Sequence, residues 1–284
     1  MIFNTVISAV ALIALPQPVV IIDCRHDLAD TEAGRRAYAE GHIPGAHFLH
    51  LDADLSGTKF AGDGNFRGRH PLPEAADFIQ TLQRLGISDA TQVIAYDAHG
   101  GMFAARFWWM LRWVGHAAVA VLDGGLPAWL AAGGALSTSP APTVDGQIKL
   151  RPSLVGTVTA DQLIANLAAP TLQIIDARAA DRYRGENETL DRVGGHIPGA
   201  INRFFKNNLQ ETGHFKSAAN LRTEFSEVIT DASATVMQCG SGVTACHHLL
   251  AMEIAGLPGA LLYPGSWSEW SSDSARPIAL GEVR

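Results

Sequence analysis

The chain repeats itself, and this repetition constrains its fold more than any other feature. IIDCR at 21–25 leads to GHIPGA at 41–46, and IIDAR at 174–178 leads to GHIPGA at 195–200. Six identical residues in equivalent places do not arise by chance, so we predict a tandem duplication of one domain.

Each half alternates short runs of Val, Ile, Leu and Met with longer stretches of helical spacing. Strands that are apolar on both faces and are separated by helices indicate a parallel sheet. We therefore predict an α/β fold in each half, with a parallel sheet covered by helices on both faces. The runs expected to form strands are 19–22, 93–96, 118–122, 172–175, 235–238 and 260–262.

The stretch AAGGALSTSPAPTVDGQ at 131–147 separates the two halves. It is rich in Gly, Pro, Ser and Thr and has no apolar period, which is typical of a linker. We predict an N-terminal domain at 1–140, a linker at 141–156 and a C-terminal domain at 157–284.

The apolar start of the chain, SAVALIALPQPVVIID, has a counterpart in TADQLIANLAAPTLQIID of the second half. Each indicates a Ser- or Thr-capped helix, a turn with Pro and a short strand that ends in Asp. The start also lacks the Lys or Arg that precedes the apolar core of a signal peptide. We expect it to belong to the folded domain.

Composition narrows the class of partner. The chain has 284 residues, of which 47% are apolar, and a formal net charge of −7, with no long basic run. These values disfavour a nucleic-acid or membrane partner and favour a small molecule or another protein. Its three cysteines are too few and too unevenly spaced for a disulfide framework or a zinc site, so we expect no metal and a reducing, cytoplasmic location.

One of these cysteines, Cys239, stands between an apolar run and a loop that leads into a helix, in TVMQCGSGVTACHH. Gly240 and Gly242 permit backbone conformations in which successive N–H groups turn toward one centre. Such a loop cradles an anion, and the N-terminus of the following helix favours a thiolate, which is the nucleophilic form. The alternative is that Cys239 is a small buried apolar residue, the usual state of a free cysteine.

The repeat provides an internal control for this prediction. Alignment of YDAHGG with QCGSGV places Asp97 opposite Cys239, and a carboxylate cannot form a persulfide. We therefore expect a catalytically inactive N-terminal domain and one active site in the C-terminal domain. Cys24 is replaced by Ala177 in the second copy, and Cys246 lies in the helix, so neither is expected to react.

The duplicated DxR and GHIPGA segments, together with CGSGVT at 239–244, resemble the two-domain rhodanese family of sulfurtransferases along essentially the whole chain. Within that family the loop is similar to that of the 3-mercaptopyruvate branch, which has Gly-Ser-Gly after the cysteine. Members that prefer thiosulfate carry a basic pair there instead. The resemblance implies that the loop residues bind the substrate; they are Gly240, Gly242, Val243 and Thr244, with Cys239 and Ser241 as catalytic residues.

Arginines should hold the carboxylate of the donor, because a guanidinium matches a carboxylate with two parallel hydrogen bonds. The resemblance assigns this role to Arg182 and Arg192, although the position of Arg192 is shifted by about one residue from the common pattern. Arg184 is a possible substitute. Any of the three could instead form a surface ion pair with neighbouring carboxylates.

The resemblance also implies a histidine near Ser241, and GRHPLP at 68–73 supplies His70. Relatives place an Asp beside it, within Leu-Ser-Asp, but this chain has Gly57 at that position. Asp54 and Asp63 are the candidates to replace it.

These residues imply sulfur transfer from 3-mercaptopyruvate, through a persulfide on Cys239, to cyanide or to a thiol such as that of reduced thioredoxin. No cofactor is required. The alternatives are thiosulfate as the donor, or a non-catalytic sulfur-relay or binding protein. A cysteine phosphatase also has a cysteine loop of this kind, but it needs an arginine at position 245, where this chain has Ala.

Overall fold

The computed structural model describes residues 2–16, 18–142 and 144–282, and it divides into two compact units. Unit 1 takes its residues from 1–57, 73–154 and 209–215. Unit 2 takes its residues from 58–72, 155–208 and 216–284.

The two units contain sheets of the same topology. In each, five parallel strands pair in an equivalent order, β1-β5-β4-β2-β3 in unit 1 and β6-β10-β9-β7-β8 in unit 2. This identity of order confirms that the halves are copies of one domain. The strands are β1 Val6–Ile7, β2 Val19–Asp23, β3 Ala46–Phe48, β4 Gln92–Tyr96, β5 Val119–Leu122, β6 Gly156–Thr157, β7 Gln173–Asp176, β8 Ile201–Asn202, β9 Thr235–Gln238 and β10 Leu261–Leu262.

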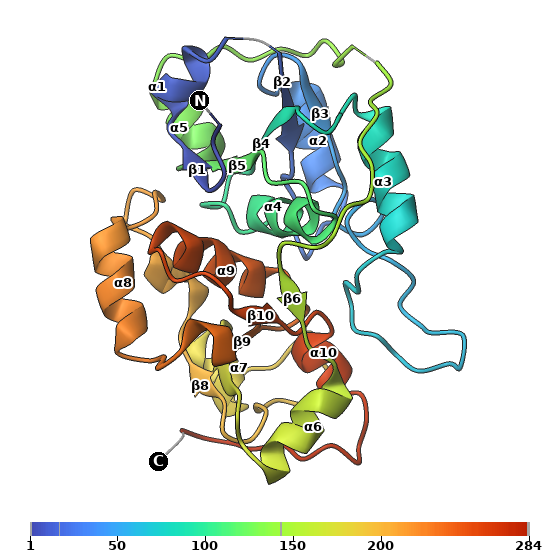
Figure 1. Ribbon diagram of the computed structural model, residues 1–284, viewed down its shortest axis with the longest axis vertical. Helices are drawn as coiled ribbons and strands as arrows, with labels where there is room; N and C mark the ends of the chain where they lie inside the picture. The colour runs from blue at the N-terminus through green and yellow to red at the C-terminus, as the bar shows by residue number, and fades with distance from the viewer. Residues whose placement is uncertain (1, 17, 143, 283–284) are drawn as a thin grey trace. The chain divides into compact units, whose positions relative to one another are not determined.

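In unit 1 helices cover both faces of the sheet (Figure 1). Leu12 of α1 and Trp129 of α5 share a buried cluster with Ile94 and Leu122 of the strands. Helix α4 lies against β4 and β5, and its Phe107 contacts Phe78 of α3 with ring centroids 6.2 Å apart. The helices of this unit are α1 Ala9–Ile13, α2 Ala33–Glu40, α3 Ala75–Arg84, α4 Ala104–Trp113 and α5 Gly125–Ala131.

Unit 2 repeats this plan. Leu163 of α6 and Trp267 of α10 pack in one cluster with Ile174 and Val236 of the strands, while α9 lies against β9, β10 and α8. The prediction of an α/β fold with helices on both faces is therefore confirmed. The helices are α6 Ala160–Ala168, α7 Ala180–Arg184, α8 Ala218–Ser226, α9 Thr244–Ile254 and α10 Ser266–Trp270, with 3-10 turns η1 Phe205–Asn208 and η2 Ala232–Ala234.

The helix starts predicted near the beginning of each copy are present. The Ser8 hydroxyl accepts a hydrogen bond from Ala11 N–H at 3.2 Å, and the Thr159 hydroxyl accepts one from Gln162 N–H at 3.2 Å. Such caps satisfy N–H groups that the first helical turn leaves without a partner.

One short arm of each copy belongs to the other unit. Residues 58–72 lie in unit 2 and residues 209–215 in unit 1, and each arm closes on itself through one antiparallel bridge, Phe60 with Phe66 and Leu209 with Phe215. The domain boundaries predicted at 140 and 157 do not account for this exchange, and they stay predictions. Its consequence is that residues 58–72 pack against the C-terminal copy.

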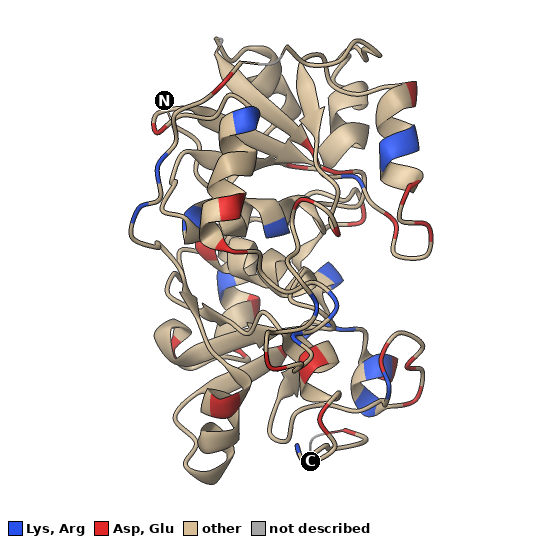
Figure 2. Ribbon diagram, turned by 90° about the vertical axis from the view of Figure 1, so that its right-hand side faces the viewer, with Lys and Arg blue, Asp and Glu red and all other residues tan. Residues whose placement is uncertain are grey.

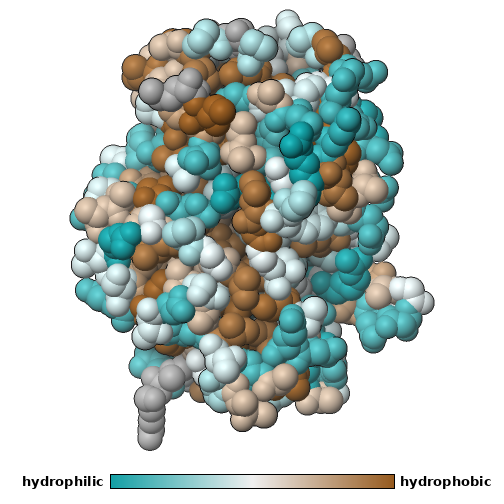
Figure 3. All heavy atoms as spheres, viewed as in Figure 1, coloured by the Kyte–Doolittle hydropathy of each residue, from teal (hydrophilic) through white to brown (hydrophobic). Residues whose placement is uncertain are grey.

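The surface carries both signs of charge. Figure 2 shows Lys and Arg interspersed with Asp and Glu along the ribbon. Figure 3 shows apolar groups separated by polar ones on the face drawn. Within the described ranges, no helix is both long and apolar enough to span a membrane.

Candidate active site

Cys239 lies where a parallel-sheet protein usually binds its ligand, at the carboxyl end of a central strand. Strand β9 ends at Gln238, the loop follows, and α9 begins at Thr244. The thiol-bearing residue is 2% exposed, and Ser241, Gly242 and Val243 are also buried, while Thr244 is half-buried.

The two loop glycines serve different purposes. Gly242 has φ +75°, and a Cβ there would lie 2.3 Å from the Pro264 carbonyl oxygen, so only glycine fits. Gly240 lies outside the left-handed region. Its lack of a side chain instead leaves room for two guanidinium groups, because a Cβ at Gly240 would lie 2.9 Å from Arg69 Nη2 and 3.6 Å from Arg182 Nη2.

Two buried carboxylates hold these guanidinium groups beside the loop. Arg182 Nη2 donates to Glu188 Oε1 at 2.8 Å and lies 3.4 Å from Asp191 Oδ2, and Arg69 Nη1 forms an ion pair with Asp191. The carboxylate side chains are 4% and 3% exposed, whereas the Arg182 and Arg69 side chains are 21% and 22% exposed. The cations therefore retain a surface that an anionic substrate can reach.

The contacts of Glu188 favour its ionised form. Burial by itself raises the pKa of the Glu188 carboxyl, but hydrogen bonds from Arg182 and from the Leu190 backbone outweigh burial and leave the pKa below its ordinary value. The negative charge of Glu188 fixes the orientation of Arg182.

The other two candidate arginines have exposed surroundings. Arg192 is exposed, and the guanidinium that accompanies Arg182 at the loop is that of Arg69. Arg184 pairs with the exposed Glu186 at 2.7 Å. The assignment of Arg192 to the donor's carboxylate stays a prediction.

Ser241 and His70 are in contact. His70 Nδ1 lies 2.8 Å from Ser241 Oγ, and both side chains are buried. With the proton on Nδ1, the ring donates to Ser241 Oγ and leaves the serine hydroxyl hydrogen for a second acceptor, which is the arrangement that a proton relay toward an anion needs. Of the two candidate aspartates, Asp54 accepts from His50 N–H at 2.7 Å and Asp63 accepts from Asn65 N–H at 3.0 Å. A role for either one beside His70 stays a prediction.

Backbone contacts fix the arm that carries Arg69 and His70. Arg69 N–H donates to Ser268 Oγ at 3.1 Å. Gly68 has φ +100°, and a Cβ there would lie 2.8 Å from the Gly265 carbonyl oxygen, so the arm approaches the β10–α10 turn as closely as a glycine allows. Arg69 of the arm thus lies beside Gly240 of the loop, and His70 contacts Ser241.

The equivalent loop of unit 1 shows what this type of loop binds. The Asp97 carboxylate accepts hydrogen bonds from the backbone N–H groups of His99, Gly101, Phe103 and Ala104 at 2.7 to 3.0 Å. The backbone N–H groups of the loop after β4 therefore bind a carboxylate, that of Asp97 at the start of the same loop. This observation supports the prediction that the same place in unit 2 is an anion cradle.

We expect Asp97→Asn to destabilise unit 1, because the amide NH2 would face two of the four N–H donors. A cost of about 2 kcal/mol is expected for hydrogen bonds to a buried charge. Thermal and urea unfolding measure it. Asp89→Asn removes an exposed carboxylate of the same unit, so it is the matched control and should leave the midpoint nearly unchanged. Equal midpoints for the two variants would contradict the role of Asp97.

The remaining cysteines have settings that suppress reactivity. Burial, with Asp23 and Asp97 nearby, raises the pKa of the Cys24 thiol well above its ordinary value. Cys246 donates from Sγ to the Gly242 carbonyl oxygen at 3.2 Å.

Two arginines that are present in both copies belong to the scaffold of the fold. Arg25 binds Asp23 and the Gly41 carbonyl, and Arg178 binds Asp176 and the Gly195 carbonyl in the same manner. The hydrogen-bond partners named for each guanidinium lie outside the loop at 239–244.

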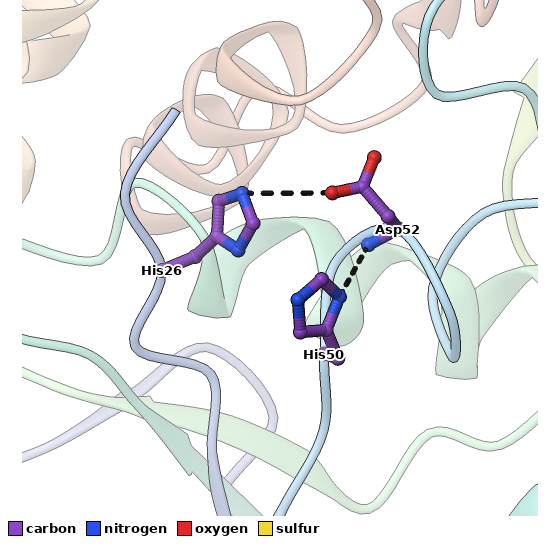
Figure 4. Close-up of side chains that lie close together, drawn as sticks. All are labelled: His26, His50 and Asp52. Atoms are coloured by element: carbon purple, nitrogen blue, oxygen red, sulfur yellow. Dashed lines mark hydrogen bonds and ion pairs between the residues drawn. The ribbon is translucent and has the colours of Figure 1, made fainter. Parts of the chain in front are cut away.

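One group in unit 1 has the composition of a metal site (Figure 4). Ligand atoms of His26, His50 and Asp52 lie within 4.8 Å of one another, and His26 Nε2 is 3.9 Å from Asp52 Oδ2. However, His50 Nε2 contacts the Thr31 carbonyl at 2.9 Å and His50 Nδ1 accepts from Asp52 N–H at 3.1 Å. Because both ring nitrogens are engaged by the backbone, His50 has no lone pair available for a metal.

Comparison with known proteins shows to which family the chain belongs. A family model described as "Rhodanese-like domain" matches residues 8–132 and, a second time, residues 159–273. The chain belongs to the rhodanese family. The family predicted from the sequence is thereby confirmed.

Relatives in the family differ in the donor that they are named for. The "Probable 3-mercaptopyruvate sulfurtransferase" of Pseudomonas aeruginosa is 45% identical over 266 residues, 93% of each chain. The "Thiosulfate sulfurtransferase" of Rattus norvegicus is 36% identical over 258 residues, 88% of this chain and 84% of the relative. The solved structure of "3-mercaptopyruvate sulfurtransferase from Leishmania major" is 29% identical, has a TM-score of 0.85 and covers 97% of this chain and 76% of that one.

Within this rhodanese site, sequence reasoning missed Arg69. It directly precedes His70, and an arm that carries the histidine to the loop carries its neighbour as well. That adjacency was the available signal, but the side chain's approach to Gly240 depends on the exchange of residues 58–72 into unit 2.

Proposed function

We propose that this rhodanese-family chain is a sulfurtransferase that moves sulfur from 3-mercaptopyruvate to a thiol or cyanide through a persulfide on Cys239. One observation carries the proposal. The loop of a buried cysteine is bordered by the guanidinium groups of Arg69 and Arg182 and contains a serine bonded to His70. Cations, nucleophile and proton donor thus meet at one loop.

In the first step Arg182 and Arg69 bind the carboxylate of 3-mercaptopyruvate and orient its sulfur toward Cys239. The thiolate attacks that sulfur, an S–S bond forms and the donor's C–S bond breaks. The electron pair of the broken bond leaves as the enolate of pyruvate, while Cys239 becomes a persulfide.

The enolate requires a proton. The Ser241 hydroxyl is the candidate donor, and His70 can replace its proton through the 2.8 Å contact. The loop N–H groups then stabilise the anionic outer sulfur, as the equivalent N–H groups stabilise the Asp97 carboxylate.

In the second step the acceptor attacks the outer sulfur, the S–S bond breaks and the Cys239 thiolate returns. Cyanide leaves as thiocyanate, and a thiol acceptor such as reduced thioredoxin takes the sulfur as its own persulfide. Each cycle restores the starting thiolate, and no cofactor takes part.

Thiosulfate is the second candidate donor, and Arg69 favours it. The loop itself is neutral from Gly240 to Thr244, but two external guanidinium groups supply the charge that a dianion needs. The two donors also differ in their leaving groups. Sulfite, which leaves from thiosulfate, needs no proton, whereas the enolate that leaves from 3-mercaptopyruvate does.

A donor comparison with a Ser241→Ala variant tests the proposal. The wild type is expected to show a kcat/KM for 3-mercaptopyruvate at least about 10-fold above that for thiosulfate, with cyanide as acceptor. Ser241→Ala should lower the 3-mercaptopyruvate value by about 100-fold and spare the thiosulfate value, because only the enolate needs the relay. A wild type that prefers thiosulfate would replace the first donor with the second. Absence of transfer from both donors would leave only the non-catalytic alternative.

The expected setting is the reducing cytoplasm. Cys24, Cys239 and Cys246 are all free thiols, which fits that compartment. With a net charge of −7, a nucleic-acid or anionic membrane partner is not part of the proposal.

A further inference from the structure

Ser266 has an unfavourable backbone conformation. Among the residues that the structure describes, it is the only non-glycine with positive φ, at 52°, and it is completely buried. A left-handed conformation is strained for a non-glycine residue and persists where the surroundings require it. A contact of the Ser266 side chain should therefore explain why this position is not glycine.

That contact is with the backbone of the nucleophile. The Ser266 hydroxyl accepts a hydrogen bond from Cys239 N–H at 3.1 Å and donates one to the Tyr263 carbonyl at 2.9 Å. The hydroxyl is thus fully engaged between the loop that carries Cys239 and the end of β10.

The next two residues hold the loop from the same side. Trp267 N–H donates to the Cys239 carbonyl at 3.0 Å, and Ser268 N–H donates to the Gly240 carbonyl at 2.9 Å. In a planar trans peptide the N–H points opposite to the C=O. Anchoring these carbonyls therefore turns the N–H groups of Gly240 and Ser241 away from α10.

The inactive copy lacks two of these three contacts. Gly125, at φ +59°, stands where unit 2 has Ser266, and it has no hydroxyl. Leu126 N–H still donates to the Asp97 carbonyl at 2.8 Å, but Pro127, opposite Ser268, has no N–H to donate. The hydrogen bonds of Ser266 and Ser268, and the strained backbone of Ser266, therefore occur in the copy that contains Cys239.

We propose that Ser266 is a positioning residue for sulfur transfer, whose hydroxyl fixes the Cys239 backbone so that the loop amides face the reacting sulfur. This inference rests on the proposed function of Cys239. It explains why strain is retained at position 266 when the same turn in unit 1 uses glycine.

Two variants separate the hydroxyl from the strain. Ser266→Gly removes both, and Ser266→Ala removes the hydroxyl while keeping the strain. Both are expected to lower kcat by about 10- to 100-fold with little change in the KM of the donor, because the loop is misaligned but the arginines remain. Thermal unfolding should rank the glycine variant as the more stable of the two, although both lose the same activity.

Ser271→Ala is the matched control, since Ser271 is also a buried serine, five residues further along the chain. It is expected to keep the wild-type kcat. The proposal is overturned if Ser266→Gly keeps the wild-type kcat, or if kcat follows the unfolding temperature across the variants.

A second readout does not depend on the donor. The rate of alkylation of Cys239 by iodoacetamide at fixed pH should fall in both Ser266 variants and not in Ser271→Ala. Unchanged alkylation would contradict the role of Ser266. If the wild type transfers no sulfur but alkylation still depends on Ser266, the proposed function fails and the positioning of Cys239 stands.

Discussion

Cys239→Ser should abolish sulfur transfer, with a loss of at least about 1,000-fold in kcat, because an alkoxide cannot form and release a persulfide. The substitution changes one atom in a buried loop, so the fold should be retained. Cyanolysis assays measure the loss with either donor. Mass spectrometry of the donor-treated wild type should find a single added sulfur atom, on a peptide that contains Cys239.

Cys24→Ala and Cys246→Ala are the controls. The second copy carries Ala177 where the first has Cys24, so alanine is a residue that this place in the fold accepts. Both variants should retain most of the activity, since burial raises the pKa of Cys24 and the Cys246 thiol donates to the Gly242 carbonyl. A persulfide on Cys24 would contradict the assignment of the nucleophile.

Arg182→Ala should lower kcat/KM for 3-mercaptopyruvate by about 30- to 1,000-fold. Two effects combine. The donor loses a paired, charge-assisted contact, and the carboxylates of Glu188 and Asp191 lose a neutralising partner next to an anionic substrate. Arg182→Lys should recover little, because an ammonium group cannot bind two carboxylate oxygens in one plane.

Arg184→Ala provides the matched control, because Arg184 lies on the same helix and pairs with the exposed Glu186. Its kcat/KM is expected to stay near the wild-type value. Near-wild-type kinetics for Arg182→Ala as well would mean that the Arg182 ion pairs serve only the fold.

A Gly240→Arg substitution is a poor way to add positive charge to the loop, since the new side chain would meet Arg69 and Arg182.

The central strands could be predicted because their signal is local. The runs at 93–96 and 235–238 are apolar on both faces, which is typical of the middle of a parallel sheet. Strands β1, β6 and β8 have only two residues each and β3 has three, and they lie at sheet edges. Such short segments carry no period of their own, so their neighbours decide whether they pair.

The loop that contains Cys239 could likewise be predicted from adjacent residues. Cys239, two glycines and a following helix are consecutive in the chain, and the comparison with Asp97 needed only the repeat. The sequence by itself therefore determined the duplication and the α/β fold, and it predicted the nucleophile.

Only the tertiary structure decided which side chains surround that loop. Arg69 lies beside Gly240 because residues 58–72 pack within the C-terminal unit, and Ser266 reaches the Cys239 N–H across the β10–α10 turn. The physical reason is distance along the chain. Helix and strand periods, caps and tight turns are set by neighbours within a few residues, whereas a contact between residues 69 and 240 depends on the path of everything folded between them.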